Sequence, residues 1–321
     1  MAPKIDLSTY LTTKGDDIGA LSFMEEDYHE NFGFQWTRFN KLQLDSYNGS
    51  SESKDRLLHQ SEMVEDDFKD KVVLEIGAGN GRFTEVLLQF GAKVIAVDYS
   101  TAINANYNNH IESVKKGDLI CMRADLFNLP IKKNVFDIVI CYGVIQHTGD
   151  NKRCLNTLAS FVGPRGFLLA DIYSNSLKHF NPWIYLIRPV FSRMKGSASS
   201  KMQIVVKFVD LFFPIQLKIL KFLHNKAGLF RYIKYLVNRS PNSVYGINLF
   251  LDKKISLKDA KDWSICDTYD AWMPKHDDPL SFKQWKRLLS ELDETSDLSV
   301  VISKQCGQGN CAVLEMKKSN T

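Results

Sequence analysis

The sequence predicts an α/β protein with a largely parallel central sheet. The first indication is the stretch 72–100, which contains a buried strand, a glycine-rich turn, a helix and a second buried strand. The second is that apolar segments of strand length alternate with helical segments as far as residue 173. The third is the end of the chain, where two alternating segments flank Gly307-Gln308-Gly309 and predict an antiparallel hairpin.

The stretch 72–100 has the pattern of a cofactor-binding turn. Apolar residues fill most of the run 72–76 and suit a strand that is covered on both faces. Glycine allows a sharp turn and the close approach of a ligand to the backbone. Three glycines follow the strand at alternate positions: Gly77, Gly79 and Gly81. A helical pattern then covers residues 83–90, and the next strand ends at Asp98, where an acid can accept both hydroxyls of a ribose.

The spacing of the glycines separates two classes of cofactor. A dinucleotide fingerprint requires a glycine where this chain has Arg82. Glu75 also precedes the first glycine by two positions, and an anion there would disfavour a pyrophosphate. E-x-G-x-G-x-G followed by an acid at the next strand end resembles the class I S-adenosylmethionine (SAM)-dependent methyltransferases. An NAD-type or other nucleotide-binding domain is the alternative.

This resemblance implies a Rossmann-like fold with a seven-stranded mixed sheet of strand order 3-2-1-4-5-7-6. We expect the third, fourth and fifth strands at 118–124, 136–142 and 167–173. The closing hairpin, expected at 298–305 and 310–317, agrees with this fold because a standard dinucleotide domain would end in parallel strands. A helical insertion separates the fifth strand from the sixth.

The resemblance also implies a set of residues that bind the cofactor, SAM. At the first two strand ends they are Glu75, Gly77, Ala78, Gly79, Gly81, Asp98, Tyr99 and Ser100. Asp125 and Leu126 match the family's adenine-binding position, supported by a D…LP…FD pattern over residues 125–137. The alternative for Asp125 is a solvated loop acid. Tyr142 and Gly143 follow the fourth strand and are implied to line the methionine end of SAM.

The aromatic segment FGFQW near the N-terminus resembles an element of methyltransferases encoded among bacterial surface-polysaccharide genes. That resemblance implies that Trp36 folds over the cofactor cleft. The alternative is that Trp36 and Phe39 anchor an N-terminal helix to the core.

Two histidines are candidates for the general base that a hydroxyl acceptor needs. His147 lies in the loop after the fourth strand, where the family places its methyl-transfer site. The alternative for His147 is a structural role in capping the next helix. His276 lies in the segment 267–278, which resembles a further element of the polysaccharide-associated methyltransferases. The alternative for that segment is a plain surface loop.

The charge is distributed unevenly along the 321 residues. Residues 175–255 contain fourteen Lys/Arg and two Asp/Glu, a balance of about +12, whereas the whole chain carries +4. We expect an N-terminal helical cap over 1–70, a SAM-binding core over 71–173, a basic helical lid over 174–255 and a C-terminal completion of the core over 256–321. A basic lid favours an anionic acceptor, although a solvated face is the alternative.

The sequence therefore predicts a SAM-dependent methyltransferase that O-methylates a small-molecule, glycan or lipid-linked acceptor. The alternative is a non-catalytic SAM-binding protein whose basic lid docks on a membrane or a partner. No NPPY-like run follows the fourth strand, and no nucleic-acid-binding motif accompanies the charge, so we do not expect a nucleic-acid substrate. No metal-ligand spacing is present either, and Cys306 and Cys311 are expected to be reduced. Without a signal peptide or an apolar span, we expect a cytoplasmic protein, with peripheral membrane contact left open.

Overall fold

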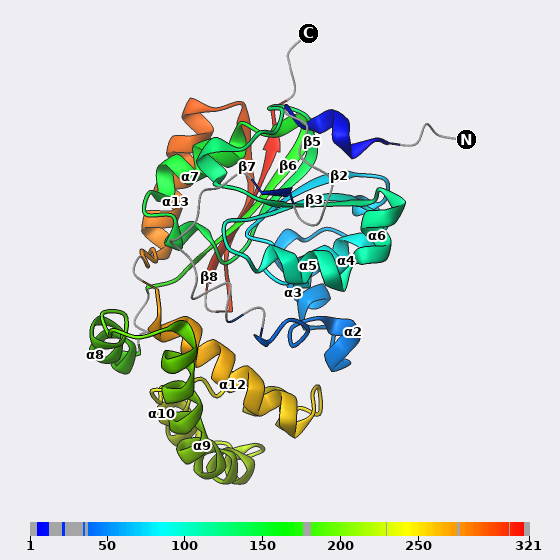
Figure 1. The fold of residues 1–321 in the computed structure, drawn as a ribbon. Helices are drawn as coiled ribbons and strands as arrows, with labels where there is room; N and C mark the ends of the chain where they lie inside the picture. The colour runs from blue at the N-terminus through cyan, green and yellow to red at the C-terminus, as the bar shows by residue number, and fades with distance from the viewer. Residues whose placement is uncertain are drawn as a thin grey trace. The chain divides into compact units, whose positions relative to one another are not determined.

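The computed structural model describes residues 5–12, 21–22, 35, 38–175, 181–228, 230–274, 277–307 and 309–317. The chain forms two compact units (Figure 1). The first, which we call the sheet unit, comprises residues 1–29, 52–179 and 276–321. The second, the helical unit, comprises residues 30–51 and 180–275.

The sheet unit is built on the predicted mixed sheet. Its main strands are β2 (Val72–Ile76), β3 (Lys93–Asp98), β4 (Leu119–Arg123), β5 (Phe136–Cys141), β6 (Val162–Tyr173), β7 (Leu298–Cys306) and β8 (Gly309–Met316). They lie in the order β4-β3-β2-β5-β6-β8-β7, and β8 runs antiparallel to both of its neighbours. This order confirms the predicted 3-2-1-4-5-7-6 topology. A two-residue strand that was not predicted, β1 (Leu21–Ser22), adds a parallel edge beside β4.

Helices cover both faces of the sheet because successive strand residues point to opposite sides. On one side, Leu74 and Ile76 of β2 share a core with α7 (Asn151–Ala159) and α13 (Phe282–Thr295). On the other side, Val73 packs with α3 (Glu52–Ser61), α4 (Arg82–Gln89) and α5 (Ile103–Asn109), while α6 (Ile111–Lys116) continues this layer (Figure 1). Short 3-10 helices lie in the connections: η1 (Leu7–Tyr10), η2 (Glu65–Phe68), η3 (Leu126–Asn128) and η4 (Ile145–His147).

The helical unit has a separate core. Its helices are α2 (Asp45–Asn48), α8 (Pro182–Phe191), α9 (Ala198–Leu223), α10 (Phe230–Val237), α11 (Tyr245–Leu251) and α12 (Leu257–Trp272). Val209 and Phe213 of α9 pack in one cluster with Trp263 and Tyr269 of α12. This cluster assigns α12 to the helical unit, whereas we expected residues from 256 onward to complete the sheet core. Likewise α3 belongs to the sheet unit, so the expected N-terminal cap over 1–70 is divided between the two units.

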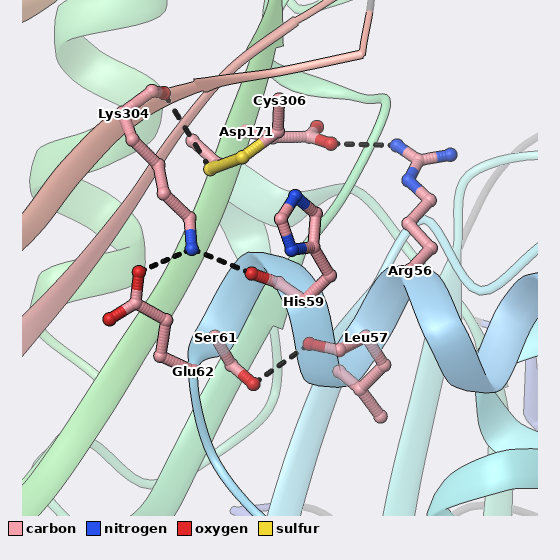
Figure 2. The surroundings of a disulfide bond; sticks show 9 residues. Arg56, Leu57, His59, Ser61, Glu62, Asp171, Lys304 and Cys306 are labelled. Atoms are coloured by element: carbon pink, nitrogen blue, oxygen red, sulfur yellow. Dashed lines mark hydrogen bonds and ion pairs between the residues drawn. A yellow bond between two sulfur atoms is a disulfide. The ribbon is translucent and has the colours of Figure 1, made fainter.

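The closing hairpin contains a disulfide that was not expected. Cys306 of β7 and Cys311 of β8 are bonded to each other, whereas the other four cysteines are free and buried. In the same region the Lys304 ammonium donates to the carboxylate of Glu62 and to the carbonyl oxygen of His59 (Figure 2). These hydrogen bonds join β7 to the end of α3.

Candidate functional site

All three glycines of the turn after β2 have a positive φ, which favours glycine, and two of them are closely packed as well. Gly77 has φ +75°, and a Cβ placed on it would lie 2.0 Å from Cγ2 of Val144. Gly81 has φ +95°, and its Cβ would lie 2.5 Å from the side-chain oxygen of Asn106. Beside Gly79, by contrast, the position of a Cβ is open to at least 4 Å. The turn is therefore held by close packing at both ends and is accessible in its middle.

Asp98 is fixed at the end of β3 by three hydrogen bonds. Its carboxylate accepts from the backbone N–H of Gly79 at 2.8 Å, and from both the N–H and the hydroxyl of Ser100 at 2.8 and 2.7 Å. Burial raises the pKa of Asp98, and these hydrogen bonds oppose that rise. A carboxylate offers about four acceptor positions. One acceptor position is therefore left for a ribose hydroxyl. To accept both ribose hydroxyls, Asp98 would have to lose one of its hydrogen bonds to the protein.

Glu75 is buried and joined to a short polar chain. The hydroxyl of Thr84 donates to its carboxylate at 2.5 Å, and the amide of Asn106 donates to that hydroxyl at 2.8 Å. Burial raises the pKa of Glu75 to about 8, and the negative charge of Asp98 adds to the rise. A cation brought to this point would favour the ionised form. The sequence analysis did not identify Thr84 or Asn106. For Thr84 a signal was available, because it is a polar residue in the first turn of the helix that follows the glycines.

The third strand end lies next to the second. The N–H of Ala124 donates to the carbonyl oxygen of Asp98 at 3.1 Å, which places Asp125 at the same edge of the sheet. The carboxylate of Asp125 accepts from the N–H of Phe127 at 3.0 Å and from the amide of Asn128 at 3.1 Å, and it thereby caps η3. Leu126 is buried, and the carbonyl oxygen of Tyr99 accepts from Arg123. The three acids at the strand ends are thus gathered along one edge.

The loop after β5 is held by an ion pair that the sequence did not reveal. The N–H of Gly143 donates to the carboxylate of Asp171 at 2.6 Å, and Arg56 contacts the other oxygen at 2.7 Å. Figure 2 shows this pair beside the disulfide. The side chain of Asp171 is only 3% exposed. An acid inside the apolar run of the fifth predicted strand was the signal that could have identified it.

Tyr142 lies in the same loop and is buried. Its ring meets Phe83 edge-on at 5.4 Å between centroids, and the Arg56 guanidinium lies 5.9 Å from its ring centre. Burial raises the pKa of Tyr142. Among the described residues its buried hydroxyl has no hydrogen-bond partner, so this polar group is left unsatisfied.

His147 ends η4 and is half-buried between two segments. Its ring meets Tyr173 edge-on at 5.8 Å, and its Nδ1 lies 3.8 Å from a carboxylate oxygen of Asp277. The segment that contains Asp277 is fastened here, because the N–H of Asp278 donates to the carbonyl oxygen of Gln146 at 2.9 Å. The structure thus brings His147 together with the end of the segment 267–278. His276 and Trp36 lie outside the described residues.

The described residues contain neither a metal-binding cluster nor a membrane-spanning helix. No three His, Cys, Asp or Glu side chains in the described ranges gather in a way that would hold a metal ion. No helix in the part of the chain that the structure describes is long and apolar enough to cross a membrane.

Comparison with known proteins agrees with this geometry. A family model described as "Methyltransferase domain" matches residues 74–170. The ubiquinone biosynthesis O-methyltransferase of Coxiella burnetii is 28% identical over 120 residues, which cover 37% of this chain and 49% of the relative. The tRNA U34 carboxymethyltransferase of Ruthia magnifica is 36% identical over 109 residues, or 32% of this chain and 33% of the relative. The chain thus spans between a third and a half of the length of these two relatives.

One solved structure with a similar fold is the magnesium protoporphyrin IX methyltransferase of Synechocystis with bound SAH. The alignment covers 92% of this chain and 90% of that protein's chain. The TM-score is 0.43 and the identity is 13%. A likeness at this level carries no weight for the assignment, which rests on the family match, the sheet order and the strand-end residues. Residues 74–170 match a methyltransferase domain, and the sheet that contains them has the strand order of the class I SAM-dependent methyltransferases, with SAM as the cofactor.

Proposed function

We propose that the protein transfers the methyl group of SAM to an oxygen of a small-molecule, glycan or lipid-linked acceptor that carries negative charge. The observation that carries this proposal is the position of His147. It follows β5, and β5 lies next to β2, the strand that contains Glu75. In open α/β sheets, ligands bind at the carboxyl ends of the strands. A proton acceptor therefore lies at the edge of the sheet that holds the cofactor residues.

Methyl transfer to a hydroxyl requires the protein to align the two substrates and to provide a base. When bound, SAM supplies a methyl group that its sulfonium has already activated. The residues of the chain then have to orient the acceptor, exclude water and take up the hydroxyl proton. We assign the last step to His147. The carboxylate of Asp277 lies near Nδ1, and the edge contact with Tyr173 holds the ring.

The residues of the strand ends fit SAM. The open space beside Gly79 admits a ligand close to the backbone, and the remaining acceptor position of Asp98 suits a ribose hydroxyl. Glu75 provides a carboxyl group that gains from a nearby cation, which agrees with the positive charges of SAM. We propose that Asp125 and Leu126 hold the adenine, and that Tyr142 and Gly143 line the methionine end.

The charge of the chain and the name of one relative support the proposed acceptor class. Residues 181–251 contain eleven Lys/Arg and a single acid, Asp210, which favours an anionic acceptor or work at an anionic membrane. The Coxiella burnetii relative is named as an O-methyltransferase, which supports transfer to oxygen. The Ruthia magnifica relative is named for a tRNA, but the sequence of this chain carries no recognised nucleic-acid-binding motif.

The test is an acceptor screen with labelled SAM. The purified protein is incubated with metabolite, glycan and lipid fractions, and calorimetry measures SAM binding in parallel. We expect SAM to bind and the label to enter one fraction as a methyl ether or ester. Binding of SAM without transfer into any fraction would favour the non-catalytic alternative.

Once an acceptor is found, His147→Ala tests the base. We expect the turnover number to fall by about a hundredfold or more while SAM affinity is unchanged, because general-base catalysis contributes on this scale. His59→Ala is the matched control, since His59 is an exposed histidine of the same unit. Full turnover of the His147 variant would remove this residue from the mechanism.

A further inference from the structure

Helix α9 carries two apolar faces. One is buried against the rest of the helical unit and contains Met202, Val205, Val209, Phe213, Leu220 and Leu223. The other is exposed and contains Ile204, Leu211, Ile215, Ile219 and Phe222. The exposed residues are spaced by seven, four, four and three positions, so they form one stripe along the helix. A helix that only covers a core needs a single apolar face.

Helix α10 extends the exposed stripe. None of its residues is buried, although the sequence of the helix, FRYIKYLV, is largely apolar and aromatic. Phe230 of α10 meets Phe222 of α9 edge-on at 6.0 Å between ring centres. Tyr232 and Leu236 of α10 are 69% and 66% exposed, and Leu211 of α9 is 64% exposed. We call the exposed stripe of α9 together with α10 the apolar–basic surface.

The charges around this surface are almost all positive. Lys207, Lys218 and Lys221 lie along one side of the exposed stripe of α9 and are themselves exposed. Lys226 follows the end of α9 in the chain and lies 5.6 Å from the ring centre of Phe222. The one acid of residues 181–251, Asp210, forms an ion pair with Lys261 at 2.8 Å.

We propose that the apolar–basic surface lies in the headgroup region of an anionic lipid bilayer. Exposed Leu, Ile, Phe and Tyr side chains flanked by lysines are the composition that binds such an interface in plane. The apolar side chains enter the acyl boundary while the lysines meet the negative headgroups. A second copy of the chain is the weaker occupant, because it would bring an equally basic surface against this one. This interaction goes beyond methyl transfer and does not depend on it.

The test is co-sedimentation of the full chain with phosphatidylcholine vesicles that either contain or lack phosphatidylglycerol. We expect binding only to the vesicles with phosphatidylglycerol, and Leu211→Glu/Ile215→Glu to weaken it at least about tenfold. Both positions are exposed and glutamate favours helix, so the fold is retained. Val64→Glu/Val301→Glu, at exposed positions of the sheet unit, is the matched control and should bind as the natural protein does.

Two single-lysine variants test the contribution of positive charge and leave the apolar stripe unchanged. Lys218→Ala and Lys221→Ala should each weaken binding about fivefold, which corresponds to the contribution of one lysine near an anionic surface. Added salt should have a similar effect. Three results would each overturn the proposal. They are unchanged binding of the Leu211→Glu/Ile215→Glu variant, equal binding to both kinds of vesicle, and a natural protein that is a dimer where this variant is a monomer. SAM affinity measured on the same samples separates this result from the proposed function, because every variant should retain it.

Discussion

One ion pair in each of the two units shows how differently a charged pair can be used. In the sheet unit, Asp171 is buried, and its two oxygens are used by Arg56 and by the N–H of Gly143. In the helical unit, Asp210 pairs with Lys261 while both side chains remain about half exposed. The buried pair fixes the loop after β5, whereas the exposed pair leaves both of its charges partly accessible to solvent.

The largest expected effect is the loss of the buried pair. Asp171→Ala leaves the Arg56 guanidinium and the Gly143 N–H without their partner, so we expect the free energy of unfolding to fall by about 3 kcal/mol. Asp210→Ala is the matched control in the helical unit. It should change that free energy by less than about 1 kcal/mol, because exposed ion pairs contribute little. Urea denaturation measures the free energy of unfolding of both variants. Equal decreases in the two variants would contradict the difference between the two pairs.

The next effect concerns SAM. We expect Asp98→Ala to weaken SAM binding about a hundredfold, because it removes a charged acceptor for the ribose and frees the Gly79 turn. Asp118→Ala is the control, since Asp118 pairs with Lys93 just before β4, away from the strand ends that form the site. Calorimetry compares the two, and circular dichroism checks that both variants are folded. An unchanged affinity in Asp98→Ala would contradict our placement of the cofactor.

The smallest effect, taken over one pH unit, is a change in how the free energy of unfolding depends on pH. The folded protein raises the pKa of Glu75 to about 8, mainly through burial, so the native state binds one proton more than the unfolded state between about pH 4.5 and 8. The free energy of unfolding should therefore fall as pH rises through this window, by about 1.4 kcal/mol per pH unit from this group. Glu75→Gln should remove that part of the slope. If denaturation curves of the variant and the natural protein keep the same slope, Glu75 is ionised in the folded state.

The sequence by itself determined the strand–turn–helix core and the residues at its turns. The conformation at Gly77 and Gly81 and the position of Asp98 at a strand end follow from a run of fewer than thirty residues. Local spacing sets the local backbone, so these features can be predicted without knowing what packs around them. The topology followed too, because the alternation of strands and helices and the closing hairpin leave few arrangements.

Only the tertiary structure decided which distant residues meet. Arg56 and Asp171 are 115 positions apart, and His147 and Asp277 come from separate loops. Their pairing depends on the packing of α3 against the sheet and on the route of the chain after the helical unit, which no local pattern encodes. The same holds for α12, whose buried face joins it to α9 rather than to the sheet. The exposed stripe of α9 was also undetermined, because a pattern of apolar residues shows their spacing but not which face a neighbour covers.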